Sequence, residues 1–161
     1  MSSITSEFDS NGEEVYYHGT EDGYVHLHDS GNSFNGVNIA ASYETPNLDF
    51  GDLGTLKTLK YIKISITPEA TIQPSLDVNF DYESPDTAQP DTIVLGSIPS
   101  PSSFGTAIFG TAIFGATNDP VIRQTLEGSG HTSSYKITSD DTRGSYTING
   151  LYISFDASGR N

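Results

Sequence analysis

Two stretches between Leu56 and Tyr82 alternate apolar with polar residues, and this alternation constrains the fold most strongly. The first, Leu59–Thr67, places isoleucine at every second position, and the second, Leu76–Tyr82, does the same with other large apolar residues. Successive side chains of a strand point to opposite faces, so each stretch predicts a strand with one buried and one wet face. Such alternation is typical of antiparallel sheets, and we expect the two strands to pair in one sheet across a Pro-containing turn. The residues expected to face inward are Ile62, Ile64, Ile66, Leu76, Val78, Phe80 and Tyr82.

The composition supports an all-β domain. The 161 residues include 16 Gly and 8 Pro, which interrupt strands with turns and are poor in helix interiors. No segment keeps a helical period over three turns. We therefore predict an antiparallel, jelly-roll-like β-sandwich without a helix longer than about two turns.

Charge and cysteine content exclude several classes of protein. The formal net charge of −14 opposes binding to phosphate backbones, so we expect no sequence-specific nucleic-acid partner. The absence of cysteine excludes a disulfide framework and thiolate metal ligands. No apolar run is long enough to span a membrane, and Met1–Ile4 lacks the basic start of a signal peptide, so we expect neither membrane insertion nor export.

Residues 1–36 form a predicted acidic arm, with seven acids and no Lys or Arg. Glu14–His18 and Tyr24–His28 predict a β-hairpin around a Gly-containing loop. The polar residues from Ser2 to Asn11 show no period, so we expect disorder there. Because an isolated hairpin is marginally stable, we expect the arm to order only on the main domain or on a partner. The main domain is predicted at 37–161.

The final predicted strand, Ser145–Phe155, changes parity at Asn149-Gly150. Tyr146 and Ile148 share one face, whereas the later apolar residues lie on odd positions. We expect a β-bulge there, with Gly150 at positive φ.

An apolar segment, Phe104–Phe114, repeats Phe-Gly-Thr-Ala-Ile with a period of five. This period is too short for a solenoid, so we expect a Gly-broken apolar segment, part of which contacts a partner. The predicted interface residues are Phe104, Ile108, Phe109, Ile113, Phe114, Tyr16 and Tyr24.

Catalytic signals are absent from the sequence. It contains no Cys nucleophile, no Gly-x-Ser-x-Gly elbow, no P-loop and no dinucleotide-binding fingerprint. We therefore predict no enzyme activity, no catalytic residue, no cofactor and no metal.

Two groups of residues offer a metal site as an alternative to that prediction. His26-x-His28 suits a transition metal if Asp22 or His18 lies near. The row of Asp77, Asn79 and Asp81, followed by Glu83, suits calcium or paired-carboxylate chemistry. The simpler interpretation of both is a solvated polar strand face.

Several segments resemble a module of bacteriophage tail nozzle and tubular proteins. The similarity lies in Ser42–Asp52 with Lys57, Lys60, Tyr61 and Ile62, in the hairpin and linker Val15–Gly36, and in Ile148–Phe155 with Gly159-Arg160. In that family these pieces form a C-terminal part that follows propeller-like repeats, which this chain lacks. The resemblance implies a structural virion component.

One leading function and two alternatives follow from these observations. The first is a structural protein of a phage tail or head-to-tail assembly, put together in the host cytoplasm, whose partners are other virion proteins and copies of itself in a ring. The alternatives are a carbohydrate- or receptor-binding β-sandwich, with its ligand on loops or on a Tyr-lined face, and a capsid decoration protein.

Overall fold

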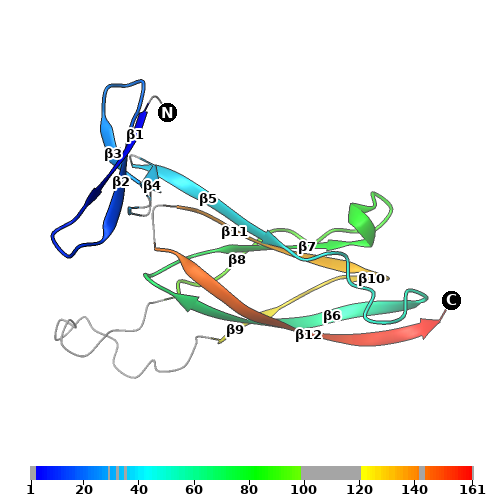
Figure 1. Ribbon diagram of the computed structural model, residues 1–161. Coiled ribbons are helices and arrows are strands. Elements are labelled where there is room, and N and C mark those ends of the chain that lie inside the picture. The colour runs from blue at the N-terminus through cyan, green and yellow to red at the C-terminus, as the bar shows by residue number, and fades with distance from the viewer. Residues whose placement is uncertain are drawn as a thin grey trace. The chain divides into compact units, whose positions relative to one another are not determined.

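The computed structural model describes residues 3–28, 30–31, 33–34, 36–98, 121–141 and 144–160. Within them the chain is built from antiparallel strands and a single short 3-10 helix, η1 (Asp81–Glu83) (Figure 1). The strands are β1 Ser3–Phe8, β2 Glu14–Gly19, β3 Val25–Leu27, β4 Ser33–Phe34, β5 Val37–Glu44, β6 Thr55–Pro68, β7 Ser75–Phe80, β8 Ile93–Val94, β9 Val121–Thr125, β10 Ser129–Gly130, β11 Ser133–Asp141 and β12 Tyr146–Arg160. The predicted absence of long helices is confirmed for these residues.

The chain divides into two compact units, Met1–Asn32 and Ser33–Asn161. The sequence prediction placed this boundary after Gly36. The observed division falls earlier because β4 pairs with β5 and so belongs with the second unit.

The first unit is a three-stranded sheet in the order β1-β2-β3. The predicted hairpin is confirmed as β2 and β3. The expected disorder before Asn11 is wrong, since β1 pairs with β2 along its whole length. A tight turn makes this pairing possible: the Asp9 carboxylate accepts the backbone N–H groups of Asn11 at 2.8 Å and Glu13 at 2.9 Å, and Gly12 adopts a φ of 81°.

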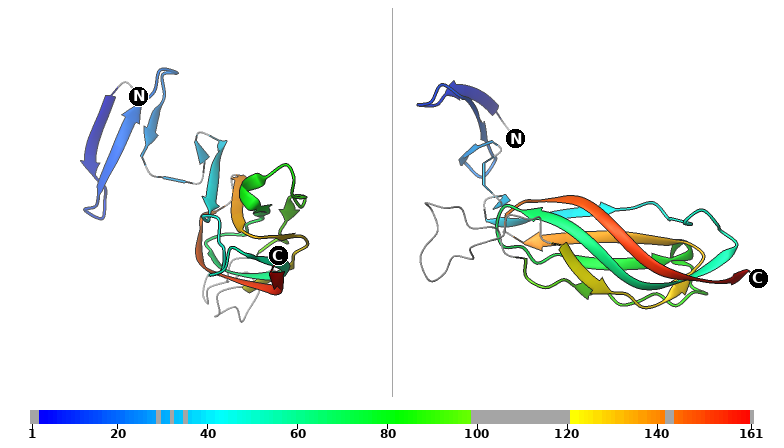
Figure 2. Two further views of the ribbon diagram at one scale, coloured as in Figure 1. Left: turned by 90° about the vertical axis from the view of Figure 1, so that its right-hand side faces the viewer. Right: turned by 90° about the horizontal axis from the view of Figure 1, so that it is seen from below.

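The second unit consists of two sheets that enclose one hydrophobic core. One sheet has the order β4-β5-β11-β7-β8, and in the other β6 pairs with β12 on one edge and with β9 and β10 on the opposite edge. β6 and β12 run side by side as a long twisted ribbon (Figure 2). The antiparallel β-sandwich is confirmed, and its jelly-roll connection stays a prediction.

The core is built largely from the alternating stretches that the sequence identified. Every predicted inward residue of β6 and β7 is buried, together with Tyr135 and Ile137 of β11. β6 and β7 do not, however, lie next to each other in one sheet. They lie in opposite sheets, so their apolar faces meet across the core.

Tyr82 departs from the prediction, because its side chain is 72% exposed. The strand period ends at Phe80, after which Asp81, Tyr82 and Glu83 all adopt a positive φ of 48–59°. This left-handed turn rotates Tyr82 away from the core.

The bulge near Asn149-Gly150 is confirmed. Ile148 pairs with Ile66, while Gly150 pairs with Ser65, so one extra residue stands in β12. The positive φ expected at Gly150 is wrong, since that glycine is not among those with a left-handed backbone. The bulge therefore depends on the inserted residue and needs no left-handed backbone.

Candidate functional site

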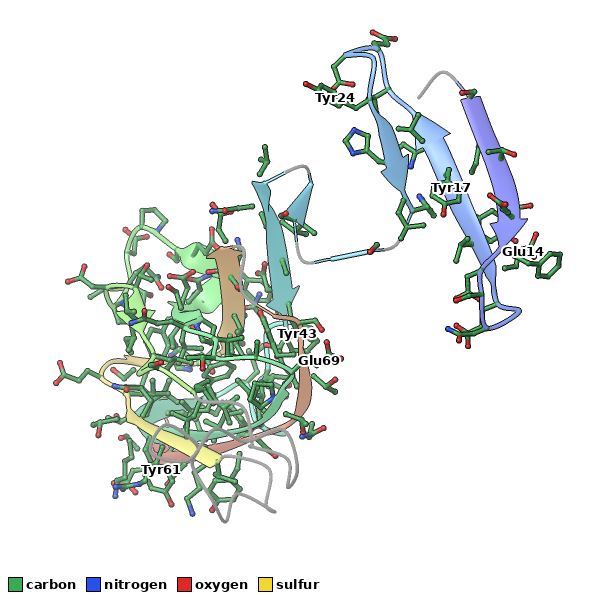
Figure 3. The ribbon with its side chains drawn as sticks, turned by 90° about the vertical axis from the view of Figure 1, so that its left-hand side faces the viewer. Glu14, Tyr17, Tyr24, Tyr43, Tyr61 and Glu69 are labelled. Atoms are coloured by element: carbon green, nitrogen blue, oxygen red, sulfur yellow. The ribbon has the colours of Figure 1, made fainter. Side chains whose placement is uncertain are left out.

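Five of the predicted interface residues lie outside the described part of the chain: Phe104, Ile108, Phe109, Ile113 and Phe114. The other two, Tyr16 and Tyr24, belong to the first unit and are 44% and 63% exposed. A hydrogen bond with the Glu14 carboxylate raises the pKa of the Tyr16 phenol. Figure 3 shows Tyr24 at the loop between β2 and β3.

The predicted acidic row is divided between β7, which holds Asp77 and Asn79, and η1, which holds Asp81 and Glu83, and its side chains are engaged with their surroundings. One carboxylate oxygen of Asp81 accepts the backbone N–H groups of His131 at 2.7 Å and Thr132 at 2.9 Å. The Asn79 amide donates to Glu83 at 2.8 Å, and Asp77 accepts the Thr92 hydroxyl. These residues therefore connect loops at one end of the sandwich and hold the left-handed turn in place.

The histidines of the sequence motif come together with a third one. The ring of His18 stacks on that of His26 with centroids 5.6 Å apart, and it meets the ring of His28 edge-on at 5.5 Å. With the side chains as they stand, no group of three or more His, Cys, Asp or Glu among the described residues is arranged to hold a metal ion.

The outer face of the β9-β6-β12 sheet carries an aromatic and basic cluster. We name it the aromatic–basic patch, and it consists of Tyr61, Lys63, Arg123 and Tyr152. The strand register explains the cluster, because Lys63 of β6 pairs with Arg123 of β9 on one side and with Tyr152 of β12 on the other. Tyr61 lies two residues before Lys63 and shares its face. Figure 3 shows Tyr61 at the edge of the second unit beside β9.

Cations and rings alternate within the patch. The Arg123 guanidinium lies 4.3 Å from the centroid of the Tyr61 ring, and the Lys63 ammonium lies 5.8 Å from the centroids of both tyrosine rings. The two ring centroids are 6.2 Å apart. Cation–π contacts at exposed sites are worth about 0.5–1 kcal/mol each, so these side chains hold one another in place.

The composition of the patch is unusual for this chain. It holds two of the seven Lys and Arg residues in a protein of net charge −14. Tyr152 is 58% exposed, and Lys63 and Arg123 are exposed as well. Tyr and Arg are enriched among the residues that dominate binding energies at interfaces. The patch can therefore supply apolar contact area, hydrogen bonds and positive charge together.

Sequence reasoning found only part of this patch. The alternation in β6 placed Tyr61 and Lys63 on the wet face, but it did not point to Arg123 or Tyr152. Those two join the patch through the register of β9 and β12 against β6. Register between strands far apart in sequence depends on the assembled core, and no local pattern in this chain encodes it.

No protein-family model matches the chain, and no curated protein matches it.

Among the described residues, the structure contains no helix with the length and apolar character needed to cross a membrane.

Proposed function

We propose that this protein is a structural component of a bacteriophage virion, in the tail or the head-to-tail assembly, and that it acts through protein–protein contacts. The observation that carries the role in protein–protein contacts is the aromatic–basic patch. Its tyrosines and arginine are held in place by mutual contacts, so little side-chain freedom is lost when a partner binds.

The partner surface is defined by the chemistry of the patch. The two cations attract carboxylates, while the tyrosine rings cover apolar or planar groups. We therefore infer a partner that presents acidic side chains next to apolar ones. Because the rest of the chain is strongly acidic, the patch is also where another copy of this protein can approach with complementary charge.

The virion setting rests on the sequence resemblance to tail nozzle and tubular proteins. We propose that copies of this chain form a ring whose symmetry comes from the surrounding particle. The absence of catalytic motifs fits a non-enzymatic role in such an assembly.

Quantitative mass spectrometry of purified particles tests this proposal, using the phage whose genome encodes the chain. We expect the protein in a fixed ratio to the portal protein, after density-gradient purification and salt washing. A protein that is abundant in the infected lysate but missing from the washed particles would contradict a structural role.

A carbohydrate-binding role is the second candidate, and the same patch favours it. Tyr61 and Tyr152 offer stacking surfaces for a sugar ring, and Lys63 and Arg123 favour an acidic saccharide. An array of neutral and acidic glycans tests this role. Binding to acidic glycans that is lost in Tyr152→Ser, but kept in the matched Tyr43→Ser on the other sheet, would favour the carbohydrate role over the structural one.

A further inference from the structure

The N-terminal unit lacks the buried core that normally holds a sheet together. None of its described residues is buried, and the unit spans only Met1–Asn32. Units shorter than about 40 residues usually need disulfides, metals or oligomerisation for stability. A disulfide is excluded because the chain contains no cysteine. The unit therefore needs stabilisation from a partner or from a bound ion.

Three of the four histidines in the chain lie on one face of this sheet. His18 of β2 and His26 of β3 are direct partners across the strands, so their side chains share a face. His28 follows His26 by two residues, which returns it to that face. The backbone of His28 donates to the Tyr16 carbonyl at 2.7 Å, which continues the pairing of β2 and β3 to this position.

The spacing of the three rings suits a transition-metal ion. The ring centroids of His26 and His28 lie 5.6 Å and 5.5 Å, respectively, from the ring centroid of His18. Metal–nitrogen bonds of about 2.0–2.1 Å in tetrahedral geometry place three imidazole rings roughly 5 Å apart. The rings do not converge in their present rotamers, but rotation about the side-chain torsions can turn their nitrogens toward a common point without moving the strands.

His18 supplies an independent indication of a ligand. The His18 side chain is half-buried, and its Nδ1 atom is shielded from solvent and has no hydrogen-bond partner among the described residues. Buried polar atoms are nearly always satisfied, so an orphaned imidazole nitrogen in the middle of a histidine cluster marks a place where a further bonding partner fits.

We propose that His18, His26 and His28 bind one transition-metal ion, such as Zn²⁺, which cross-links β2 to β3 and stabilises the N-terminal sheet. Neutral imidazoles are good ligands for zinc, copper and nickel. The fourth coordination position is left to water or to a group from a partner. This site is separate from the aromatic–basic patch and does not depend on the proposed function.

Calorimetric titration of the metal-free full-length protein with ZnCl₂ tests the site. We expect one Zn²⁺ per chain, and an affinity at least about tenfold lower in each of His18→Gln, His26→Gln and His28→Gln, since each variant removes one of three ligands. His131→Gln is the matched control because it removes the only other histidine, which lies in the second unit. It should bind Zn²⁺ like the wild type.

Hydrogen exchange supplies a readout that does not depend on affinity. Zn²⁺ should slow amide exchange in β2 and β3 and leave β6 and β7 unchanged, and EDTA should reverse the effect. The proposal is overturned if the wild type takes up no zinc at micromolar concentrations, if His131→Gln weakens binding as much as the other variants, or if binding leaves exchange in β2 and β3 unchanged.

Discussion

Phe80 shows how tightly single positions are constrained at the end of the sandwich near η1. A Cβ atom added to Gly130 would lie 2.7 Å from Cδ1 and 2.9 Å from Cβ of Phe80, and 3.0 Å from the Thr132 carbonyl oxygen. Phe80 is buried and cannot move aside freely. At Gly150, by contrast, no atom of the described residues lies within 4 Å of an added Cβ.

These two glycines give a matched pair of substitutions. Gly130→Ala should lower the free energy of unfolding by about 1–3 kcal/mol, because the added methyl overpacks the core. Gly150→Ala should leave it unchanged or raise it by up to about 1 kcal/mol, since alanine restricts the unfolded chain more than glycine does. Urea denaturation of both variants measures the difference. A cost at Gly150 equal to that at Gly130 would contradict the packing described here.

The buried phenol of Tyr135 should make stability depend on alkaline pH. Burial raises its pKa from the ordinary 10.0 to about 12, although a hydrogen bond with Ser133 acts in the opposite direction. Folding therefore favours the protonated phenol, so this contribution is complete below pH 10 and is lost as the pH rises toward 12.

Wild type should lose about 2 kcal/mol more than Tyr135→Phe when the pH is raised from about 9 to about 11.5. Urea denaturation of both proteins at the two pH values tests this. Equal losses in the two proteins would show that the Tyr135 phenol is not responsible.

For individual residues, the sequence correctly predicted which side chains are buried wherever apolar and polar residues alternate without interruption, as in β6 from Ile62 and in β7. It failed where backbone conformation changed, as at Tyr82 in the left-handed turn. It also missed Lys57, which is buried in β6 while its ammonium donates to backbone carbonyls of Asp52 and His131. Asp52 lies only five residues before Lys57, but His131 is distant in sequence, so the local pattern alone does not reveal the complete environment of the lysine.

At the level of elements, a register shift between β6 and β12 changes which positions of β6 are buried, and the alternation did not predict this shift. Ser154 of β12 pairs with Tyr61, but the next residue, Phe155, pairs with Leu59. Lys60 is therefore an extra residue in β6, and along the chain the buried face moves from odd positions before it to even positions after it. The strand itself could be predicted from its isoleucines, whereas the position of this bulge depends on how β12 packs against it.

The two units should differ in local stability, because none of the described residues of the first is buried whereas β6 contributes to the core. In metal-free dilute solution we expect the amides of β1, β2 and β3 to exchange much faster than those of Ile62–Ile66. Hydrogen exchange read by mass spectrometry measures this. Equal protection in both regions would show that the N-terminal sheet is stable alone.

At the level of the whole molecule, an all-β sandwich followed from alternation and composition, because both report on how each strand is buried. The assignment of β6 and β7 to opposite sheets did not follow, since alternation fixes which face of a strand is buried but not which strands pair. Arg123 and Tyr152 of the aromatic–basic patch were missed for the same reason.

Net charge should control self-association. A formal charge of −14 opposes contact between free copies, and salt screens this repulsion over about 8–10 Å near physiological ionic strength. We expect monomers or weak oligomers at low salt and larger species as the salt concentration rises. Analytical ultracentrifugation across a salt series measures this, and a monomer at every salt and protein concentration would argue against self-assembly.

Incorporation into phage particles tests the central claim most directly, namely that the aromatic–basic patch is the surface that meets a partner in the virion. Arg123→Ser and Tyr152→Ser are compared with Tyr43→Ser, which removes an exposed tyrosine from β5 of the other sheet. Each variant is supplied in trans to a phage that lacks the gene. Circular dichroism first shows that the variants fold alike. We predict that the two patch variants are reduced at least about tenfold in purified particles, in line with the weight of Tyr and Arg at interfaces. Tyr43→Ser should be incorporated normally, and equal incorporation of all three variants would contradict the account.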